Sequence, residues 1–202
     1  MSQAFHNTRT STQLLNGLRD AGNDAVWQEF VTRYQPLLSR YCLKLGLRDA
    51  DAADVTQQIL LEFSRSYQAG KYDREKGRLR QWLYGIAHNQ VRNWRRRQRN
   101  KEVQIGADSD DGDFFARIDD EHHLSQVWEE EWQDSILRRC LHQVRAEVKE
   151  TTYRAFELFA LEQKPADEVA ALLQTTANAV FSAKRRILRR IRELMPDAEE
   201  FL

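Results

Sequence analysis

Apolar residues recur at three- and four-residue spacing through most of this chain, and that spacing constrains the fold more than any other feature. The period is clear in residues 27–45, 55–67 and 79–94, and it resumes at residue 124. Side chains spaced in this way lie on one face of an α-helix. Because the apolar runs are short and only three prolines occur in 202 residues, we predict an all-α protein built from amphipathic helices.

The segment GADSDDGDF, at residues 106–114, interrupts the helical pattern. It has no period, many acidic residues and two glycines, which is typical of a linker. A length of 202 residues suits one large domain or two small ones. We therefore predict two small helical domains, residues 1–98 and 130–202, joined by an acidic flexible linker at residues 99–129.

The formal net charge is zero, but the charge is unevenly distributed along the chain. The sequence is basic from residue 71 to 101, acidic from residue 108 to 131, and basic again after residue 184. A polyanion could therefore bind both basic segments while the acidic middle stayed clear of it.

The last basic segment follows a pattern of two helices separated by a short turn. Pro165 suits the first position of a helix, and the turn falls at Gln174 and Thr175. Thr176 can cap the helix that follows, which has an apolar face opposite a polar and basic one. This pattern predicts a helix-turn-helix whose second helix enters the DNA major groove, with base edges near its N-terminal part.

The DNA contacts predicted on this second helix are Thr176, Asn178, Ser182, Arg185, Arg186 and Arg189. No acidic residue interrupts the run from Lys184 to Arg192, which favours contact with phosphates. The alternative interpretation is an ordinary solvated helix whose arginines face water.

A more specific pattern lies earlier in the chain, in DAADVTQQILLEFSRSYQAGKYDREKGRLRQWLYGIAHNQVRNWRRRQR, residues 51–99. It resembles the first conserved domain of bacterial RNA polymerase sigma factors of the sigma-seventy superfamily, in the small extracytoplasmic-function (ECF) group. ADEVAALLQTTANAVFSAKRRILRRI, residues 166–191, resembles the second conserved domain of the same group. AVWQEFVTRYQPLL, residues 25–38, fits the group's opening helix. Two such segments in the expected order are stronger evidence for a resemblance to sigma factors than a single helix-turn-helix.

The resemblance implies which residues of the first domain contact the polymerase. In the family, an Asp-x-x-Gln helix docks on a coiled coil of the polymerase's largest subunit. The corresponding residues here are Asp54, Gln57, Gln58 and Leu61. Phe63 is expected to face the core instead. Without the resemblance, Gln57 and Gln58 would be assigned to a solvated helix face.

The next helix resembles the part of sigma factors that captures the downstream (minus-ten) promoter element on the non-template strand. Holding an exposed base in a pocket and the DNA backbone on cations offsets the free energy of opening the duplex. Asn89 matches the family's polar pocket position. The residues implied in this contact are Asn89, Arg92, Asn93, Arg95, Arg96 and Arg97. Trp82 and Trp94 fit the apolar spacing, so we expect them to pack in the core.

The chain departs from the family pattern in the helix-turn-helix. Gln174 stands where the family often has glycine, and Phe181 and Ala183 stand where it often has basic residues. We therefore expect the upstream (minus-thirty-five) element read by this chain to differ from that of its relatives.

The resemblance leaves two interpretations of the acidic linker open. In the family, the connecting segment threads the active-site cleft and RNA exit path of the polymerase, where negative charge repels DNA and occupies a basic channel. The alternative is a disordered spacer whose charge only aids solubility.

These patterns together predict a cytoplasmic transcription initiation factor that binds core RNA polymerase, directs it to specific promoter DNA and helps to open the strands. We expect its control to come from a separate partner such as an anti-sigma factor. The alternative is a stand-alone helix-turn-helix transcriptional regulator that acts without replacing a sigma factor.

No catalytic, cofactor or metal site is expected. The sequence has no Gly-rich phosphate loop and no GxSxG or HExxH motif, so we do not expect an enzyme. His122 and His123 lack the ligand spacing of known metal sites. Cys42 and Cys140 lie inside helical apolar patterns and are expected to be buried free thiols. No apolar run approaches ~18 residues, so neither export nor membrane spanning is expected.

Overall fold

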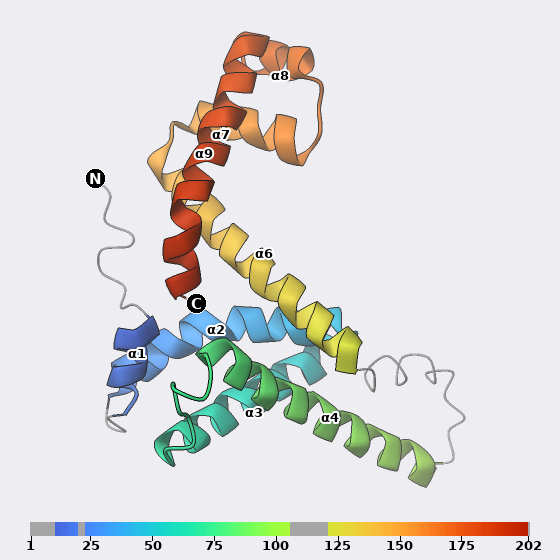
Figure 1. Cartoon of the computed structure of the whole chain (residues 1–202). Helices are drawn as coiled ribbons and strands as arrows, with labels where there is room; N and C mark the ends of the chain where they lie inside the picture. The colour runs from blue at the N-terminus through green and yellow to red at the C-terminus, as the bar shows by residue number, and fades with distance from the viewer. Residues whose placement is uncertain (1–10, 20–22, 106–120, 202) are drawn as a thin grey trace. The chain divides into compact units, whose positions relative to one another are not determined.

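The computed structural model describes residues 11–19, 23–105 and 121–201, and helices are the only regular secondary structure in these ranges. The all-α prediction is therefore confirmed for the described part of the chain. Figure 1 draws the helices, and the contacts between them divide the described chain into two units. The N-terminal unit runs from Ser11 to Gln133 and the C-terminal unit from Asp134 to Phe201.

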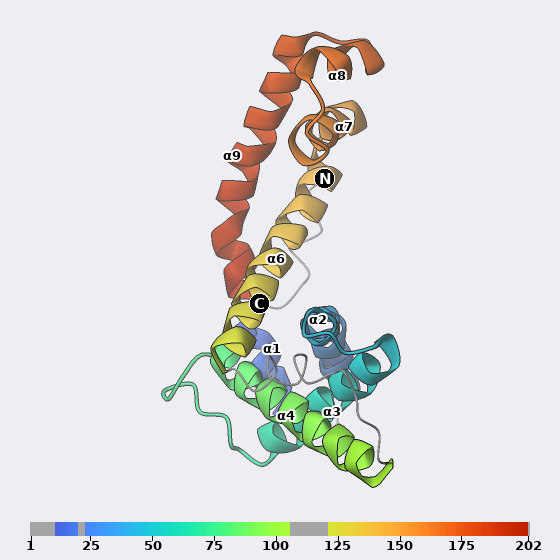
Figure 2. The same cartoon turned by 90° about the vertical axis from the view of Figure 1, so that its right-hand side faces the viewer.

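The N-terminal unit is a group of packed helices. They are α1 (Ser11–Gly17), α2 (Asp24–Lys44), α3 (Asp49–Gln68), α4 (Leu79–Ile105) and the first part of α6 (Glu121–Glu147). Helix α3 contacts both α2 and α4, and α1 contacts α2. Figures 1 and 2 show α3 and α4 side by side in two views that differ by 90°.

Local sequence sets the ends of these helices. The side chain of Asn23 caps α2 by accepting a hydrogen bond from the backbone N–H of Val26, at 3.3 Å. Gly46 (φ 84°) and Gly70 (φ 71°) follow α2 and α3 in the left-handed conformation that glycine adopts without strain. Pro36 lies inside α2, and the helix continues through it.

An aromatic cluster joins α2, α3 and α4. The Phe63 ring of α3 stacks on Phe30 of α2, with centroids 4.1 Å apart, and meets Trp82 of α4 at 5.0 Å. Each such pair contributes roughly 0.5–1.5 kcal/mol beyond the area that it buries. Trp94 is 9% exposed, and its indole N–H donates to Asp51 Oδ1 at 3.3 Å. The expectation that Phe63, Trp82 and Trp94 pack inward is thus confirmed.

The first part of α6, residues 121–133, packs inside the N-terminal unit. Glu131 is fully buried and accepts a hydrogen bond from Arg40 Nε at 2.7 Å, and Lys44 Nζ lies 3.3 Å from its other oxygen. The Trp128 ring packs against Tyr41 at a centroid separation of 5.2 Å. A buried carboxylate is tolerated here because the two cations of α2 neutralise it.

The linker predicted at residues 99–129 is described only at its two ends. Residues 99–105 continue α4, and residues 121–129 begin α6. Leu124, Val127 and Trp128 are buried in this first part of α6, so the acidic side chains there flank an apolar stripe. The middle of the predicted linker, residues 106–120, lies outside the described residues. The division into domains stays a prediction.

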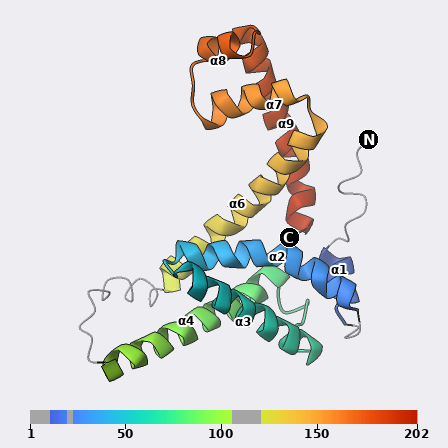
Figure 3. The ribbon, with the colours of Figure 1, turned by 180° about the vertical axis from the view of Figure 1, so that it is seen from behind.

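The C-terminal unit continues α6 and adds further helical segments. These are α7 (Glu150–Phe156), the π-helical turn η1 (Glu157–Leu161), α8 (Ala166–Leu172) and α9 (Ala177–Phe201). Helix α9 contacts both α7 and α8, which Figure 3 shows from behind. Small and branched apolar side chains form the core between these segments: Ala155, Leu158, Val169, Ala170, Val180 and Ala183.

Replacing Glu131 with glutamine tests the packing of α6 in the N-terminal unit. Glu131→Gln keeps the side-chain size but removes the charge that faces Arg40 and Lys44. The free energy of unfolding of this unit should therefore fall by roughly 1–2 kcal/mol. Urea unfolding followed by tryptophan fluorescence measures this change, because all five tryptophans of the chain lie in residues 27–132.

The matched control for this experiment is Glu130→Gln, at the exposed neighbouring position. It should change the free energy of unfolding by less than about 0.5 kcal/mol. Indistinguishable unfolding curves for Glu131→Gln and the parent protein would contradict a stabilising role of the buried ion pair.

Candidate nucleic-acid interface

The middle and later turns of α4 form a basic surface with an open cavity of about 350 Å³. The residues that line it are Asn89, Arg92, Asn93, Arg95, Arg96 and Arg99. Their three- and four-residue spacing places them along one side of the helix. The structure thus brings together all the residues predicted for the downstream element except Arg97. Arg99 was missed by sequence reasoning, although it continues the same side one turn after Arg95 and Arg96.

Arg97 lies apart from this cavity. Its Nη2 donates to Gln58 Oε1 of α3 at 2.9 Å. The side chain therefore lies beside the residues predicted to dock on the polymerase. Sequence spacing does not reveal this contact, because the two residues are far apart in the chain.

The cavity on α4 is electropositive. Arg95 is only 2% exposed, and burial, together with the charges of Arg99 and Arg92, lowers the pKa of its guanidinium. An arginine remains protonated at neutral pH despite such a shift. Arg92 Nη1 lies 3.5 Å from Glu121 Oε1, whereas Arg96 is exposed to solvent. Cations grouped in this way create a potential that attracts phosphates.

Helix α3 has a separate exposed face. Asp54, Gln57 and Leu61 are exposed and are spaced three and four residues apart, so they share one side of the helix. The Leu61 side chain is 54% exposed between polar neighbours. Gln58 is half-buried beside this face, where it accepts the hydrogen bond from Arg97. The role of these four residues in docking stays a prediction.

The turn at residues 173–176 connects α8 to α9. Gln174 adopts a left-handed conformation (φ 51°), which usually favours glycine. The backbone N–H of Ala179 donates to Thr176 Oγ1 at 3.2 Å, so the predicted cap of the second helix is confirmed. The core cluster includes Val169 from α8 and Val180 from α9, and the two helices are therefore held together by apolar contact.

Helix α9 has an apolar inner face and a polar, basic outer face. The buried residues of the inner face are Val180, Ala183, Ile187, Ile191 and Leu194. All residues predicted to contact the upstream element are exposed, namely Thr176, Asn178, Ser182, Arg185, Arg186 and Arg189. Within the described ranges, no ion pair involves Arg185 or Arg186, whereas Arg189 lies 3.9 Å from Glu193. The guanidinium groups of Arg185 and Arg186 are therefore available to phosphates.

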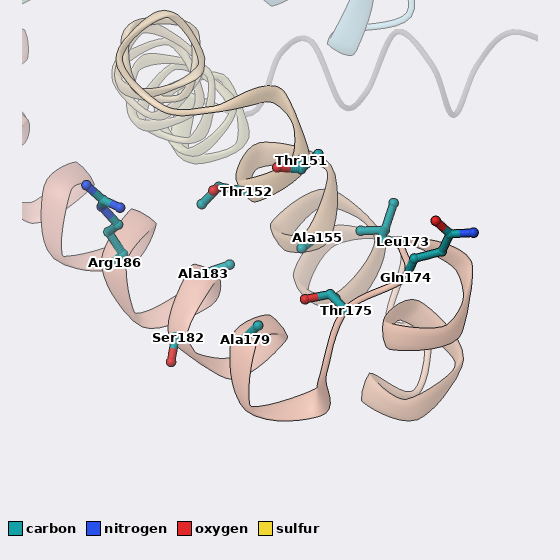
Figure 4. A pocket seen from close by; sticks show the side chains of 10 residues that line it. All are labelled: Thr151, Thr152, Ala155, Leu173, Gln174, Thr175, Ala179, Ser182, Ala183 and Arg186. Carbon is teal, nitrogen blue, oxygen red and sulfur yellow. The ribbon is translucent and has the colours of Figure 1, made fainter.

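An open cavity of about 440 Å³ lies beside this outer face. Figure 4 shows its lining, which comes from the start of α7, the turn after α8 and the first turns of α9. Ser182 and Arg186 belong to it, together with Thr151 and Thr152, which sequence reasoning missed. The sequence feature that could have indicated them is the pair of threonines at the start of a helix. Hydroxyl groups there commonly donate hydrogen bonds to phosphate oxygens of DNA.

Arg190 differs from the neighbouring arginines because it is held inside the C-terminal unit. Its Nε and Nη2 donate to the Glu147 carboxylate at 2.6 and 3.1 Å. These hydrogen bonds raise the pKa of Arg190 and lower the pKa of Glu147. The pair joins α9 to the end of α6, so Arg190 stabilises the fold rather than the outer face.

Among the described residues, no group of His, Cys, Asp and Glu side chains is arranged to hold a metal ion. Cys42 and Cys140 are buried free thiols, as expected. The described ranges contain no helix with the length and apolar character needed to cross a membrane.

The residues of the α3 face and of the α4 cavity fall within a segment that matches a known family. Residues 30–101 match sigma-70 region 2. The match supports a sigma factor of the sigma-70 superfamily, with a role in transcription initiation. Sigma region 2 binds core RNA polymerase and promoter DNA, and this family of transcription factors is not enzymatic. A comparison with curated proteins finds no match.

His88, which precedes Asn89 in α4, predicts a pH dependence of stability. Burial, followed by the charge of Arg92, lowers the pKa of His88. The unfolded chain, with a histidine pKa near 6.5, therefore binds this proton more readily than the folded protein. The N-terminal unit should lose stability as the pH falls below about 6.5 towards the lowered pKa of the folded state.

The measurement is the urea midpoint from tryptophan fluorescence, taken at several pH values between about 7.5 and 5.5. His88→Gln should flatten the loss of stability over this interval, because glutamine does not titrate. A variant that keeps the full slope of the parent protein would contradict the assignment to His88.

Proposed function

We propose that this chain is a sigma factor of the ECF group. It binds core RNA polymerase in the cytoplasm, directs the enzyme to specific promoters and helps to open the DNA strands. The observation that carries the proposal is the match of residues 30–101 to sigma-70 region 2. Both the exposed α3 face and the basic α4 cavity lie within that segment.

The α3 face has the composition of a small protein-docking surface. Leu61 supplies an exposed apolar side chain, and Asp54 and Gln57 supply polar groups beside it. An apolar contact surrounded by polar residues is the usual arrangement of a protein–protein interface. We assign this face to the coiled coil of the polymerase's largest subunit.

The α4 cavity is suited to single-stranded DNA. The Asn89 amide offers a donor and an acceptor to a base edge, and Arg92 and Arg96 are exposed beside it for phosphates. Contacts of this kind favour the open state, because base edges used in pairing are accessible only after the strands separate. We assign the cavity to the non-template strand of the downstream element.

The C-terminal unit contributes the upstream contact in this proposal. Helix α8, the turn and α9 act as a helix-turn-helix, with α9 in the major groove. Thr151, Thr152 and Arg186 surround the cavity beside α9 and bind the DNA backbone there. An anti-sigma factor is the expected regulator of such a protein.

The rival function is a stand-alone transcriptional regulator. The two are separated by adding the purified chain to core RNA polymerase and promoter DNA and measuring specific transcripts. A sigma factor gives transcripts from selected promoters only when polymerase and chain are both present. A promoter footprint by the chain alone, with no change in initiation, would establish the rival function.

Leu61→Asp tests the proposed docking face. The substitution places a charge where an apolar contact forms, so the affinity for core polymerase should fall roughly tenfold or more. Competition binding with labelled core polymerase measures this affinity. Leu43→Asp, at a leucine of α2 that is 40% exposed, is the matched control and should bind like the parent. Equal affinities for both variants would rule out the α3 face.

Asn89→Ala tests the proposed role of the α4 cavity in strand opening. Loss of one set of hydrogen bonds to an exposed base should slow opening about three- to tenfold and leave initial binding to the closed promoter nearly unchanged. A fluorescent base analogue in the downstream element reports opening, and a gel-shift assay reports initial binding. Gln90→Ala, at a neighbouring residue outside the cavity lining, is the control. Equal opening rates for Asn89→Ala and the parent would refute the assignment.

A further inference from the structure

Phe181 is an exposed aromatic side chain on the helix that we assign to the major groove. It lies in the second turn of α9 and is 52% exposed. Single exposed apolar residues are common on protein surfaces, so the exposure alone carries no function. Its position on the helix and the way its ring is held are the informative features.

The position of Phe181 places it beside the polar residues of the outer face. It follows Asn178 by three residues and precedes Arg185 by four, and both of these residues are exposed. Residues at this spacing are neighbours on a helix surface. Base edges meet the N-terminal turns of a recognition helix, so Phe181 lies in the part of α9 that reads sequence.

The ring of Phe181 is held by a second aromatic ring. It meets Phe159 of η1 edge to face, with centroids 5.3 Å apart and planes at 87°. Phe159 is half-buried and packs against the core cluster of the C-terminal unit, and Lys184 Nζ lies 5.1 Å from its ring. A ring fixed in advance loses little conformational freedom when it binds a partner.

The charge around Phe181 indicates what covers it. Lys184 and Arg185 are its nearest cations along α9, and no acidic residue occurs before Glu193. On α9, an apolar ring followed by cations and by no nearby acid fits a polyanion that carries apolar groups. The major groove of DNA is such a surface, because the C5-methyl group of thymine projects into it between two phosphate backbones.

We propose that Phe181 contacts the methyl group of a thymine in the upstream promoter element and selects thymine at that position. A phenyl ring has no hydrogen-bonding group, so it cannot bind the guanine O6 and N7 acceptors that arginine recognises. The inference rests on the proposed function, in which α9 reads the upstream element. It adds the base and the chemical group that this residue reads.

The test replaces thymine with deoxyuridine, which lacks only the methyl group. Promoters are first selected by the full chain with core polymerase from a library with a randomised upstream element. Each upstream thymine is then replaced singly, and affinity is measured by competition. At one position, replacing thymine with deoxyuridine should lower the affinity of the parent complex roughly fourfold, the value expected for one buried methyl group. The same replacement should leave the affinity of the Phe181→Ala complex unchanged.

Two other variants distinguish the methyl contact from a general loss of binding. Leu172→Ala, at an apolar residue of α8 that is 58% exposed, should keep the full sensitivity to deoxyuridine. Phe181→Arg should exchange the preference at that position from thymine to guanine. Circular dichroism of each variant confirms that the helical content is unchanged.

The outcomes that overturn the inference are separable from failure of the proposed function. If no promoter is selected and no polymerase-dependent transcripts appear, both proposals fall. If promoters are selected but Phe181→Ala keeps the sensitivity of the parent to deoxyuridine, or no thymine is sensitive, only the Phe181 assignment is wrong. If Phe181→Ala weakens binding to core polymerase without DNA, the ring contacts protein instead of thymine.

Discussion

The burial of Phe63 between Phe30 and Trp82 is the interaction on which the N-terminal unit depends. It joins α2, α3 and α4 at one point, and so determines how α3 and α4 are rotated about their axes. With Phe63 inward, helical geometry turns Leu61 outward, because residues two apart lie on different sides of a helix. Trp94, bonded to Asp51, fixes the later turns of α4 in the same way. The two exposed faces are therefore consequences of core packing.

Some cations of this chain form ion pairs that stabilise the fold, and others are available to bind phosphates. Arg40 is paired with buried Glu131, and Arg190 is paired with Glu147, and in both cases a carboxylate from α6 stabilises the fold of its own unit. Arg185 and Arg186 have no such partner among the described residues. A neutral net charge is thus compatible with strong local attraction for phosphates, since the acids neutralise the cations that build the structure.

The resemblance to sigma factors indicated most of the α4 residues that line the basic cavity. Sequence periodicity predicted the all-α fold and the buried stripe of α9. These features depend on residues three and four positions apart, which the sequence shows directly. The contact of Arg97 with Gln58 and the burial of Glu131 could not be predicted in this way. They depend on which distant helices meet. Residues 121–129 were assigned to the linker because they are acidic, although the apolar period resumes at residue 124 and these residues begin α6.

Gln174 and Phe181, which depart from the pattern that the sequence resemblance implies, have different physical consequences. Gln174 takes the left-handed conformation that usually favours glycine, at a strain of roughly 1 kcal/mol. Phe181 leaves the inner face of α9 unaltered, because Val180 and Ala183 still fill the core. The first departure therefore affects stability and the second affects the chemistry of the outer face. Under the proposed function, a change of the second kind alters which promoter is read and leaves the fold intact.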